Sequence, residues 1–192
     1  MRYRVAALAL LLALPACELL QNTTTTPPSK LGGGTVTPPA TGGRTQISLS
    51  NVSAKPGQTA QITATLGSGG VRVAGTQNDI GFDPRQVAIA RKGNGKPDCS
   101  ANAGIGKEGT AFSFQPPGCA GAACTGIRAL VLSLSSVDAI PNGSVLYTCT
   151  VQVAAQASAG KQPLRLSRVG FSDPAGKALG GGGVDGSVTV AK

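Results

Sequence analysis

The sequence predicts an all-β fold built from short strands, arranged as a sandwich or barrel. From Gln46 onward, apolar and polar residues alternate with a period of two, which is typical of half-buried strands. Turn-forming residues recur at short intervals between these segments, as in sandwiches and barrels. No segment has the apolar spacing of an amphipathic helix, and Gly (28) and Pro (13) are frequent among the 192 residues. These observations exclude a helical or α/β domain.

Residues 1–16 have the pattern of an export signal. Arginines precede an apolar run over residues 5–16, which is too short to span a bilayer at about 20 residues per crossing. The segment Leu14-Pro15-Ala16-Cys17 resembles the lipobox of bacterial lipoproteins. This resemblance implies cleavage before Cys17, lipid attachment to it and, with Glu18 following, anchoring in the bacterial outer membrane or at the cell surface. The alternative is an ordinary secretory signal in which Cys17 is incidental.

Residues 17–45 are predicted to form a tether. They are rich in Thr, Pro and Gly, and they include Thr23-Thr24-Thr25-Thr26-Pro27-Pro28 and Gly32-Gly33-Gly34. Apolar periodicity is almost absent, so this stretch has too little surface to bury to order itself. We expect it to hold the next domain, residues 46–192, clear of the lipid surface.

Nine strands are predicted between Gln46 and the last residue. Turn residues such as Lys55-Pro56-Gly57, Asp83-Pro84 and Pro141-Asn142-Gly143 separate them. A domain of about 150 residues buries close to 70% of its unfolded surface, which is enough for a core of its own. The predicted strands are residues 47–53, 58–66, 71–82, 86–91, 110–115, 126–134, 144–153, 163–171 and 186–190.

The composition argues against catalysis and against a surface that stacks sugars or bases. There is no His, which removes the usual general base near neutral pH and any imidazole metal site. There is no Trp, and only two Tyr and four Phe are present, so a flat aromatic platform is hard to build. We expect a binding or structural protein rather than an enzyme.

Several segments, in the order in which they occur, resemble the cohesin domain. Residues 47–58 resemble the first cohesin strand and its Pro-Gly turn, and Gly81-Phe82-Asp83-Pro84 resembles the corner after the third strand. Pro141-Asn142-Gly143 and the strand after it resemble the later part of the domain. The resemblance covers essentially the whole domain. It implies a nine-stranded jelly-roll β-sandwich, with one sheet in the order 8-3-6-5 and the other in the order 9-1-2-7-4.

Cohesins bind dockerin, a small calcium-loaded module, on their 8-3-6-5 face. The resemblance therefore implies a non-catalytic module for a protein partner, dockerin-bearing or divergent, with no cofactor of its own and any calcium on the partner. Cohesins often carry Asn and Asp at the positions of Gly75 and Gln77, so the polar surface differs here. By alternation along the strand, we expect the partner-binding face to include Arg72, Gln77, Asp79 and Arg128.

Four cysteines besides Cys17 are an even number in an exported domain, which favours two disulfides over a metal site. Zinc is disfavoured because there are no paired C-x-x-C units and no His. Three pairings are possible. Cys119 and Cys124 flank a four-residue tip that suits a short disulfide. In the cohesin sheet order, the strands next to Cys99 and around Cys149 are neighbours. The resemblance therefore implies the pairs Cys99–Cys149 and Cys119–Cys124.

Two glycine-rich motifs do not fit a nucleotide site. Residues 104–109 match G-x-G-x-x-G, but they neither follow a strand nor open a helix, so we predict an inter-strand loop. Residues 180–183 lack the ending of a phosphate loop, and we predict a mobile link into the last strand. The Asp residues are scattered without the array of a calcium loop, so no metal site is expected.

The formal net charge of the chain is +9. Arg91-Lys92 with Lys96 is the only basic cluster in the sequence and has no interleaved aromatic residues, so a nucleic-acid partner is not expected. The cluster is either a solvated surface or a patch that attracts acidic envelope polymers or an acidic protein.

Three functions are compatible with these observations. The leading hypothesis is a lipid-anchored, cohesin-like module that binds a protein partner. The second is a polysaccharide-binding surface lipoprotein, because cohesins are related to carbohydrate-binding modules. The third is a structural envelope protein that uses the sandwich as a spacer.

Overall fold

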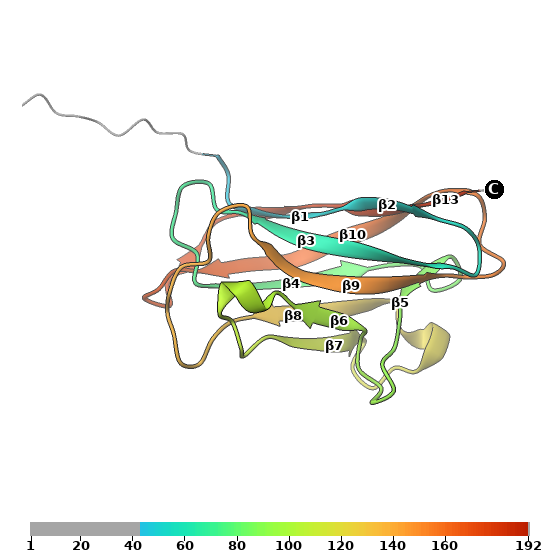
Figure 1. Cartoon of the computed structure of the whole chain (residues 1–192), viewed down its shortest axis with the longest axis horizontal. Helices are drawn as coiled ribbons and strands as arrows, with labels where there is room; N and C mark the ends of the chain where they lie inside the picture. The colour runs from blue at the N-terminus through green and yellow to red at the C-terminus, as the bar shows by residue number, and fades with distance from the viewer. Residues whose placement is uncertain (1–42, 192) are drawn as a thin grey trace, which may run out of the picture. The chain divides into compact units, whose positions relative to one another are not determined.

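Residues 43–191 fold into two β-sheets packed face to face, as described by the computed structural model (Figure 1). The predicted signal segment 1–16, Cys17 and most of the predicted tether lie outside the described residues. Of the tether, residues 43–45 are described, and Thr45 is buried, with its hydroxyl donating to the carbonyl of Ser68 at 3.0 Å. The folded domain therefore begins before Gln46. In residues 43–191, no helix is long and apolar enough to cross a membrane.

The first sheet contains the predicted second, fourth and seventh strands. Its order is β12-β1-β3-β9-β5, with the short strand β6 also paired to β9. The central pair, β3 and β9, is antiparallel, and its alternating residues are buried. β6 had not been expected from the sequence. The strands are β1 (Gln46–Leu49), β3 (Thr59–Gly67), β5 (Val87–Ile89), β6 (Cys99–Ala101), β9 (Val145–Val153) and β12 (Gly182–Val184).

The second sheet contains the predicted order 8-3-6-5, as the strands β10-β4-β8-β7, and continues through β13 to β2. A short strand, β11, pairs with the end of β10. β4 begins at Gly75 rather than at residue 71, and β8 ends at Val131 rather than at residue 134. The strands are β2 (Asn51–Ala54), β4 (Gly75–Gly81), β7 (Ala111–Gln115), β8 (Gly126–Val131), β10 (Gly160–Ser172), β11 (Ala178–Leu179) and β13 (Gly186–Val190).

Two chain segments change from one sheet to the other along the same side of the sandwich. The predicted first strand divides at Ser50 into β1 and β2, and the last segment divides at Asp185 into β12 and β13. β12 runs parallel to β1, and β13 runs parallel to β2. The implied order 9-1-2-7-4 is present as β12-β1-β3-β9-β5, with β12 in the place of the ninth strand. Residues 186–190, which were predicted as that strand, form β13 and lie beside β10 in the other sheet, and residues 182–184 of the expected mobile link form β12.

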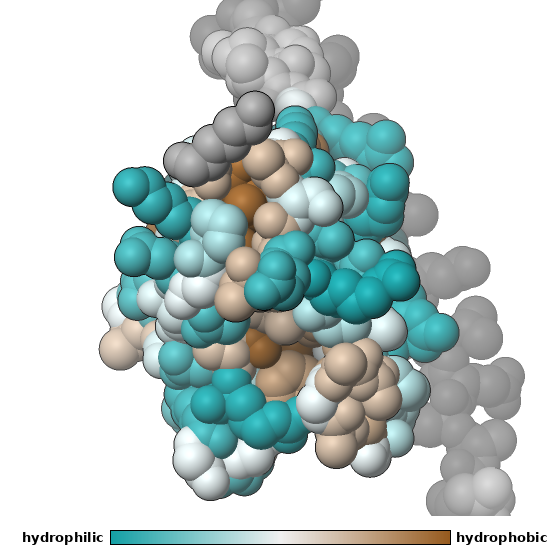
Figure 2. Space-filling view, turned by 90° about the vertical axis from the view of Figure 1, so that its right-hand side faces the viewer, coloured by the Kyte–Doolittle hydropathy of each residue, from teal (hydrophilic) through white to brown (hydrophobic). Residues whose placement is uncertain are grey.

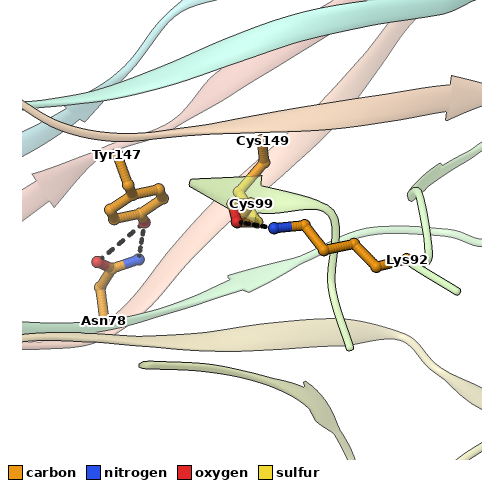
Figure 3. Close-up of a disulfide and its surroundings, with 5 residues drawn as sticks. All are labelled: Asn78, Lys92, Cys99, Tyr147 and Cys149. Carbon is orange, nitrogen blue, oxygen red and sulfur yellow. Dashed lines mark hydrogen bonds between the residues drawn. A yellow bond between two sulfur atoms is a disulfide. The ribbon is translucent and has the colours of Figure 1, made fainter. Parts of the chain in front are cut away.

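The core between the sheets contains few aromatic side chains, one of them the buried Tyr147. Asn78, on the opposite sheet, donates through Nδ2 to the Tyr147 hydroxyl at 2.8 Å, and this hydroxyl donates to Oδ1 of Asn78 at 3.1 Å (Figure 3). Burial raises the pKa of the Tyr147 phenol, so it stays protonated. Phe112 packs against the Tyr147 ring at an edge, with 5.3 Å between the centroids. The pair satisfies two polar groups that would otherwise be unpaired in an apolar core.

Both disulfides implied by the resemblance are present in the structure. Cys99 and Cys149 lie directly opposite each other on β6 and β9, and the bond joins residues 50 positions apart (Figure 3). Lys92 donates through Nζ to the carbonyl of Cys99 at 2.8 Å. Cys119 and Cys124 close the loop between β7 and β8, around a turn of 3₁₀-helix, η2 (Gly121–Ala123). The first disulfide holds β6 to β9 within the first sheet, and the second restrains the loop between β7 and β8 at one end of the second sheet.

Candidate functional site

The strands β10, β4, β8 and β7 turn one side toward the core and the other toward solvent. In β4, Thr76, Asn78 and Ile80 are buried, whereas Gln77 is exposed and Asp79 is partly exposed. The same alternation in β8 buries Ile127 and turns Arg128 outward. We call the outward side of these four strands the polar face.

A carboxylate shared by two arginines lies at the centre of the polar face. Asp79 and Arg128 are directly opposite on β4 and β8. Arg128 donates to both carboxylate oxygens of Asp79, through Nε at 2.7 Å and through an Nη atom at 2.9 Å. Arg168, from β10, approaches the same carboxylate with its Nε 3.6 Å away. Bidentate pairing fixes the orientation of Arg128 more narrowly than a single hydrogen bond would.

The charges in this cluster do not cancel. The Asp79 carboxylate raises the pKa of the Arg128 guanidinium, mainly through their hydrogen bonds, so this arginine stays charged. The Asp79 side chain is only 15% exposed, whereas that of Arg168 is 70% exposed. One carboxylate beside two guanidinium groups leaves an accessible positive charge on the polar face.

A β-bulge positions Arg168. In β10, the register against β4 shifts between Ser167 and Gly170, so that two residues of β10 stand opposite Asn78. Arg168 has a φ of 49°, in the left-handed region that side chains rarely adopt. The bulge reverses the alternation along the strand, and a reversal of this kind re-aims a side chain relative to its sheet.

The structure brings together three of the four predicted face residues. Gln77, Asp79 and Arg128 lie on the polar face. Arg72 does not, because β4 begins three residues later, and Arg72 instead lines a hollow with Asp173 and Pro174 at the end of β10. The prediction for Arg72 assumed a longer strand and is wrong.

Arg168 was not predicted to lie on the polar face. Continued alternation from the inward residues Leu164 and Leu166 would have pointed Arg168 into the core. The signal was present in Phe171, which is buried and lies at an odd spacing from these leucines. An apolar residue out of phase is typical of a strand that contains a bulge.

A hollow of about 260 Å³ lies next to Gln77 on the polar face. Leu130, Leu132 and Phe171 contribute apolar walls. Gly75 and Gly170 lie between them, and a Cβ at Gly75 would come within 2.9 Å of the Ser172 hydroxyl oxygen. Gly75 and Gln77, which stand where cohesins often carry Asn and Asp, are therefore a glycine that lines this hollow and an exposed glutamine beside it.

A loop with exposed apolar residues follows β8 at the edge of the polar face. Residues 132–138 carry Leu134, which is 89% exposed, and Val137, which is 66% exposed. Glu108 holds this loop, because its Oε1 accepts hydrogen bonds from the Ser133 hydroxyl and the Ser135 hydroxyl, both at 2.7 Å. These hydrogen bonds lower the pKa of Glu108 to about 2.

The G-x-G-x-x-G motif that contains Glu108 lies between β6 and β7. It forms an inter-strand loop, as predicted, with a turn of 3₁₀-helix, η1 (Ala103–Ile105), at its start. Lys107 in this loop is buried and donates through Nζ to the carbonyl of Asp138 at 2.7 Å. The motif therefore supports the neighbouring 132–138 loop.

The arrangement offers hydrogen-bond donors and a positive charge to a partner. Within residues 43–191, no group of three or more His, Cys, Asp or Glu side chains is placed to hold a metal ion. The polar face presents a guanidinium that can pair with a carboxylate or carbonyl, the amide of Gln77, and an apolar hollow beside them.

Comparison with known proteins identifies the architecture. No family model matches the sequence, and no curated protein is significantly similar to it. Among solved structures, the sixth cohesin of scaffoldin B from Acetivibrio cellulolyticus, in complex with a dockerin, is 14% identical; the match covers 78% of this chain and 100% of that chain, with a TM-score of 0.62. A type I cohesin in a dockerin complex from Clostridium thermocellum is 16% identical, with coverage of 78% and 100% and a TM-score of 0.62.

A cohesin described as non-cellulosomal is similar too. A non-cellulosomal cohesin from the archaeon Archaeoglobus fulgidus is 13% identical, covers 78% of this chain and 93% of its own, and gives a TM-score of 0.58. The similarity extends over almost the full length of each of these domains, and the sheet order β10-β4-β8-β7 is the one that the sequence resemblance implied. The described part of the chain therefore has the cohesin fold.

Proposed function

We propose that this protein is a non-catalytic, cohesin-like binding module that presents its polar face to a protein partner. The observation that carries the proposal is the cluster of Asp79, Arg128 and Arg168 at the centre of an open sheet face. A guanidinium already held by a carboxylate loses little freedom when a partner binds, so less of the binding energy is spent on ordering it.

The partner is a dockerin-bearing protein or a divergent module of similar shape. Several solved cohesins with this fold are in complex with dockerins. Gly75 and Gln77 replace the Asn and Asp that cohesins often carry, so the partner's complementary positions differ as well. The hollow beside Gln77 suits an apolar side chain of the partner, and the exposed Leu134 extends this contact. Any calcium belongs to the partner.

We further propose that the module is tethered to a membrane through lipid on Cys17. The segment Leu14-Pro15-Ala16-Cys17 and the Thr/Pro/Gly-rich stretch after it support this proposal, with Glu18 favouring the outer membrane or cell surface. Several acyl chains, each contributing about 0.8 kcal/mol per buried CH₂, give durable anchoring.

A pull-down with purified dockerin modules tests the binding function. The immobilised full chain is incubated with a panel of dockerins in calcium and again with a chelator. We expect retention of at least one module in calcium and its release by the chelator. The proposal fails in its dockerin form if no module is retained in calcium.

Two arginine variants locate the contact. Arg168→Gln removes an exposed charge from the centre of the polar face, and we expect it to reduce retention. Arg85→Gln is the matched control, because Arg85 is also exposed and ion-paired, to Asp83 at 3.2 Å, but lies in the turn that follows β4 and not on this face. Equal loss in both variants would show that net charge, rather than the polar face, governs binding.

A further inference from the structure

A second surface lies along the free edge of β7, which is the last strand of the polar face. A hollow of about 340 Å³ runs beside residues 112–115 of this strand. Its other wall comes from the turn between β5 and β6 and includes Arg91, Lys96 and Pro97. This is the basic cluster of the sequence, and the polar face makes no use of it.

Arg91 is held in place within this hollow. Its guanidinium lies 4.2 Å from the centre of the Phe114 ring. One Nη atom donates to the carbonyl of Gly95, 2.6 Å away, and the other donates to Sγ of Cys124, 3.4 Å away. A guanidinium has five N–H donors, so most of them are left for a ligand. Stacking on an aromatic ring keeps the charge in one orientation at small entropic cost.

The hollow has positive charge without a matching negative charge. Arg91 and Lys96 are both exposed. Neither forms a salt bridge with any carboxylate of the described residues, and no Asp or Glu lines the hollow. Lys92 lies between them in the sequence, and its Nζ donates a hydrogen bond to the carbonyl of Cys99. Uncompensated cations in a concave site attract an anionic ligand more strongly than the same charges on a convex surface.

The edge of β7 supplies a second kind of recognition. β7 pairs with β8 on one side, and no described strand pairs with it on the other (Figure 1). Alternate N–H and C=O groups along such an edge point outward and are free to pair with another extended chain. Phe112 and Phe114 are only partly exposed, and Phe112 packs against Tyr147, so the strand does not offer a stacking platform for sugars.

Apolar surface lies next to this edge at the end of the sandwich. A hollow of about 250 Å³ shares Arg91 and Phe114 with the first one and is also lined by Phe82 and Ile89. Figure 2 looks onto this end of the domain and shows hydrophobic surface recessed between hydrophilic side chains. A chain lying along β7 would reach this recess with one further side chain.

We propose that an extended acidic peptide of a partner protein binds as an added strand along the free edge of β7, with its carboxylates paired to Arg91 and Lys96. Backbone hydrogen bonds would give the peptide its direction, and the two cations would select acidic side chains. Side chains on one face of a strand are about 7 Å apart, so alternate residues of the peptide would be the acidic ones. This surface adjoins the polar face at β7 and includes none of Asp79, Arg128 and Arg168.

The test uses a short labelled peptide in which Glu and Thr alternate, titrated with the full chain and followed by fluorescence anisotropy. We expect binding at low ionic strength that weakens in about 0.5 M salt, where charges are screened beyond about 4 Å. A peptide with Gln in place of Glu should not bind. A peptide with the same Glu residues but N-methylated at alternate backbone positions should also fail, because it cannot form the ladder.

Variants of the protein test whether Arg91 and Lys96 are the cations that pair with the peptide. Arg91→Gln and Lys96→Gln should each weaken binding about fivefold, as expected for one partly exposed ion pair. Lys161→Gln is the matched control, since Lys161 is exposed on β10 opposite Thr189 and far from this edge in the sheet order. An unchanged denaturation midpoint separates the loss from unfolding, and Lys96 on the rim provides a test that does not disturb the stacked arginine.

Three results would overturn the proposal. The first is that the wild-type chain does not bind the acidic peptide. The second is that Arg91→Gln and Lys96→Gln bind this peptide as tightly as the wild-type chain does. The third is equal binding of the N-methylated peptide together with displacement by polygalacturonate, which would assign the surface to an acidic polysaccharide. None of these results bears on dockerin binding at the polar face.

Discussion

At the scale of single residues, the pair of Asn78 and Tyr147 stabilises a core that has few aromatic side chains. Replacing Tyr147 by Phe would leave the buried amide of Asn78, which is 0% exposed, without a partner. We expect Tyr147→Phe to lower the free energy of unfolding by about 1–3 kcal/mol, the usual cost of an unsatisfied buried polar group. Denaturant unfolding measures this change.

The double variant Asn78→Leu, Tyr147→Phe distinguishes a polar effect from a packing effect. Removing both partners leaves no unsatisfied group, so we expect most of the lost stability to return. If the single variant is as stable as the wild type, the hydrogen bonds of this pair do not contribute to stability.

Glu108 makes the loop of residues 132–138 sensitive to acid. Hydrogen bonds from Ser133 and Ser135 lower the pKa of Glu108 from 4.5 to about 2 in the folded protein. A depressed carboxyl pKa stabilises the folded state fully above the unfolded pKa, and this contribution is lost as the pH falls through the folded pKa. We therefore expect the loop to loosen between pH 4.5 and about 2, as measured by hydrogen exchange of its amides.

Glu108→Gln is the matching variant, because it keeps the size of the side chain and removes its titration. We expect the loop of the variant to exchange faster at neutral pH and to lose its acid dependence over this range. A loop that loosens equally in both proteins would point to another carboxyl group.

At the scale of elements, the change of sheet at Ser50 and Asp185 depends on a close approach of two backbones. A Cβ at Gly186 would lie 2.5 Å from the carbonyl oxygen of Ser50, which is closer than atoms can pack. We expect Gly186→Ala to lower the free energy of unfolding by about 1–3 kcal/mol, since β2 and β13 must move apart. Thermal or denaturant unfolding measures it.

Gly180→Ala is the control for this prediction. A Cβ at Gly180 would meet no atom within 4 Å, so a methyl group there has room. Equal destabilisation by the two substitutions would mean that the loss of glycine itself, and not the contact with Ser50, is responsible.

Alternation with a period of two was sufficient to predict the strands that carry the polar face, because one side of each is buried. It placed Gln77 and Asp79 outward, as the structure has them. It failed at Arg168, where a bulge adds one residue, and at Arg72, where the strand begins later than the apolar pattern suggested. Bulges and strand ends depend on pairing with a neighbouring strand, which the local sequence does not encode.

The sheet order shows a similar limit. The resemblance implied the orders β10-β4-β8-β7 and β12-β1-β3-β9-β5 correctly, but it did not indicate that the last segment divides and adds β13 to the other sheet. Which sheet β13 joins is decided by long-range packing: its residues pair with β2 on one side and β10 on the other. Short strands such as β6 and β12 have too few residues for alternation to identify them.

At the scale of the whole molecule, the centre of the polar face and the free edge of β7 are two different binding surfaces. The first offers a charge cluster and an apolar hollow on an open sheet, whereas the second offers unpaired backbone groups beside two cations. A shape-matched module fits a face, and an extended chain fits an edge. One domain therefore has room for a folded partner and a flexible segment at once. If both belong to one partner protein, binding of the folded part raises the effective concentration of the flexible segment at the edge of β7.

Lipid on Cys17 would fix the site at which the protein acts. If Cys17 carries acyl chains, the protein should fractionate with membranes, and its mature N-terminal peptide should have the mass of a lipid-modified cysteine. Cys17→Ser removes the thiol to which lipid is attached, so we expect this variant in the soluble fraction. The double variant Cys119→Ser, Cys124→Ser is the control, since it removes two cysteines that are joined to each other and leaves Cys17 intact. Membrane fractionation of Cys17→Ser equal to that of the wild type would show that the segment before Cys17 is not a lipoprotein signal, and the protein partner would then have to be sought among secreted or periplasmic proteins rather than at a lipid surface.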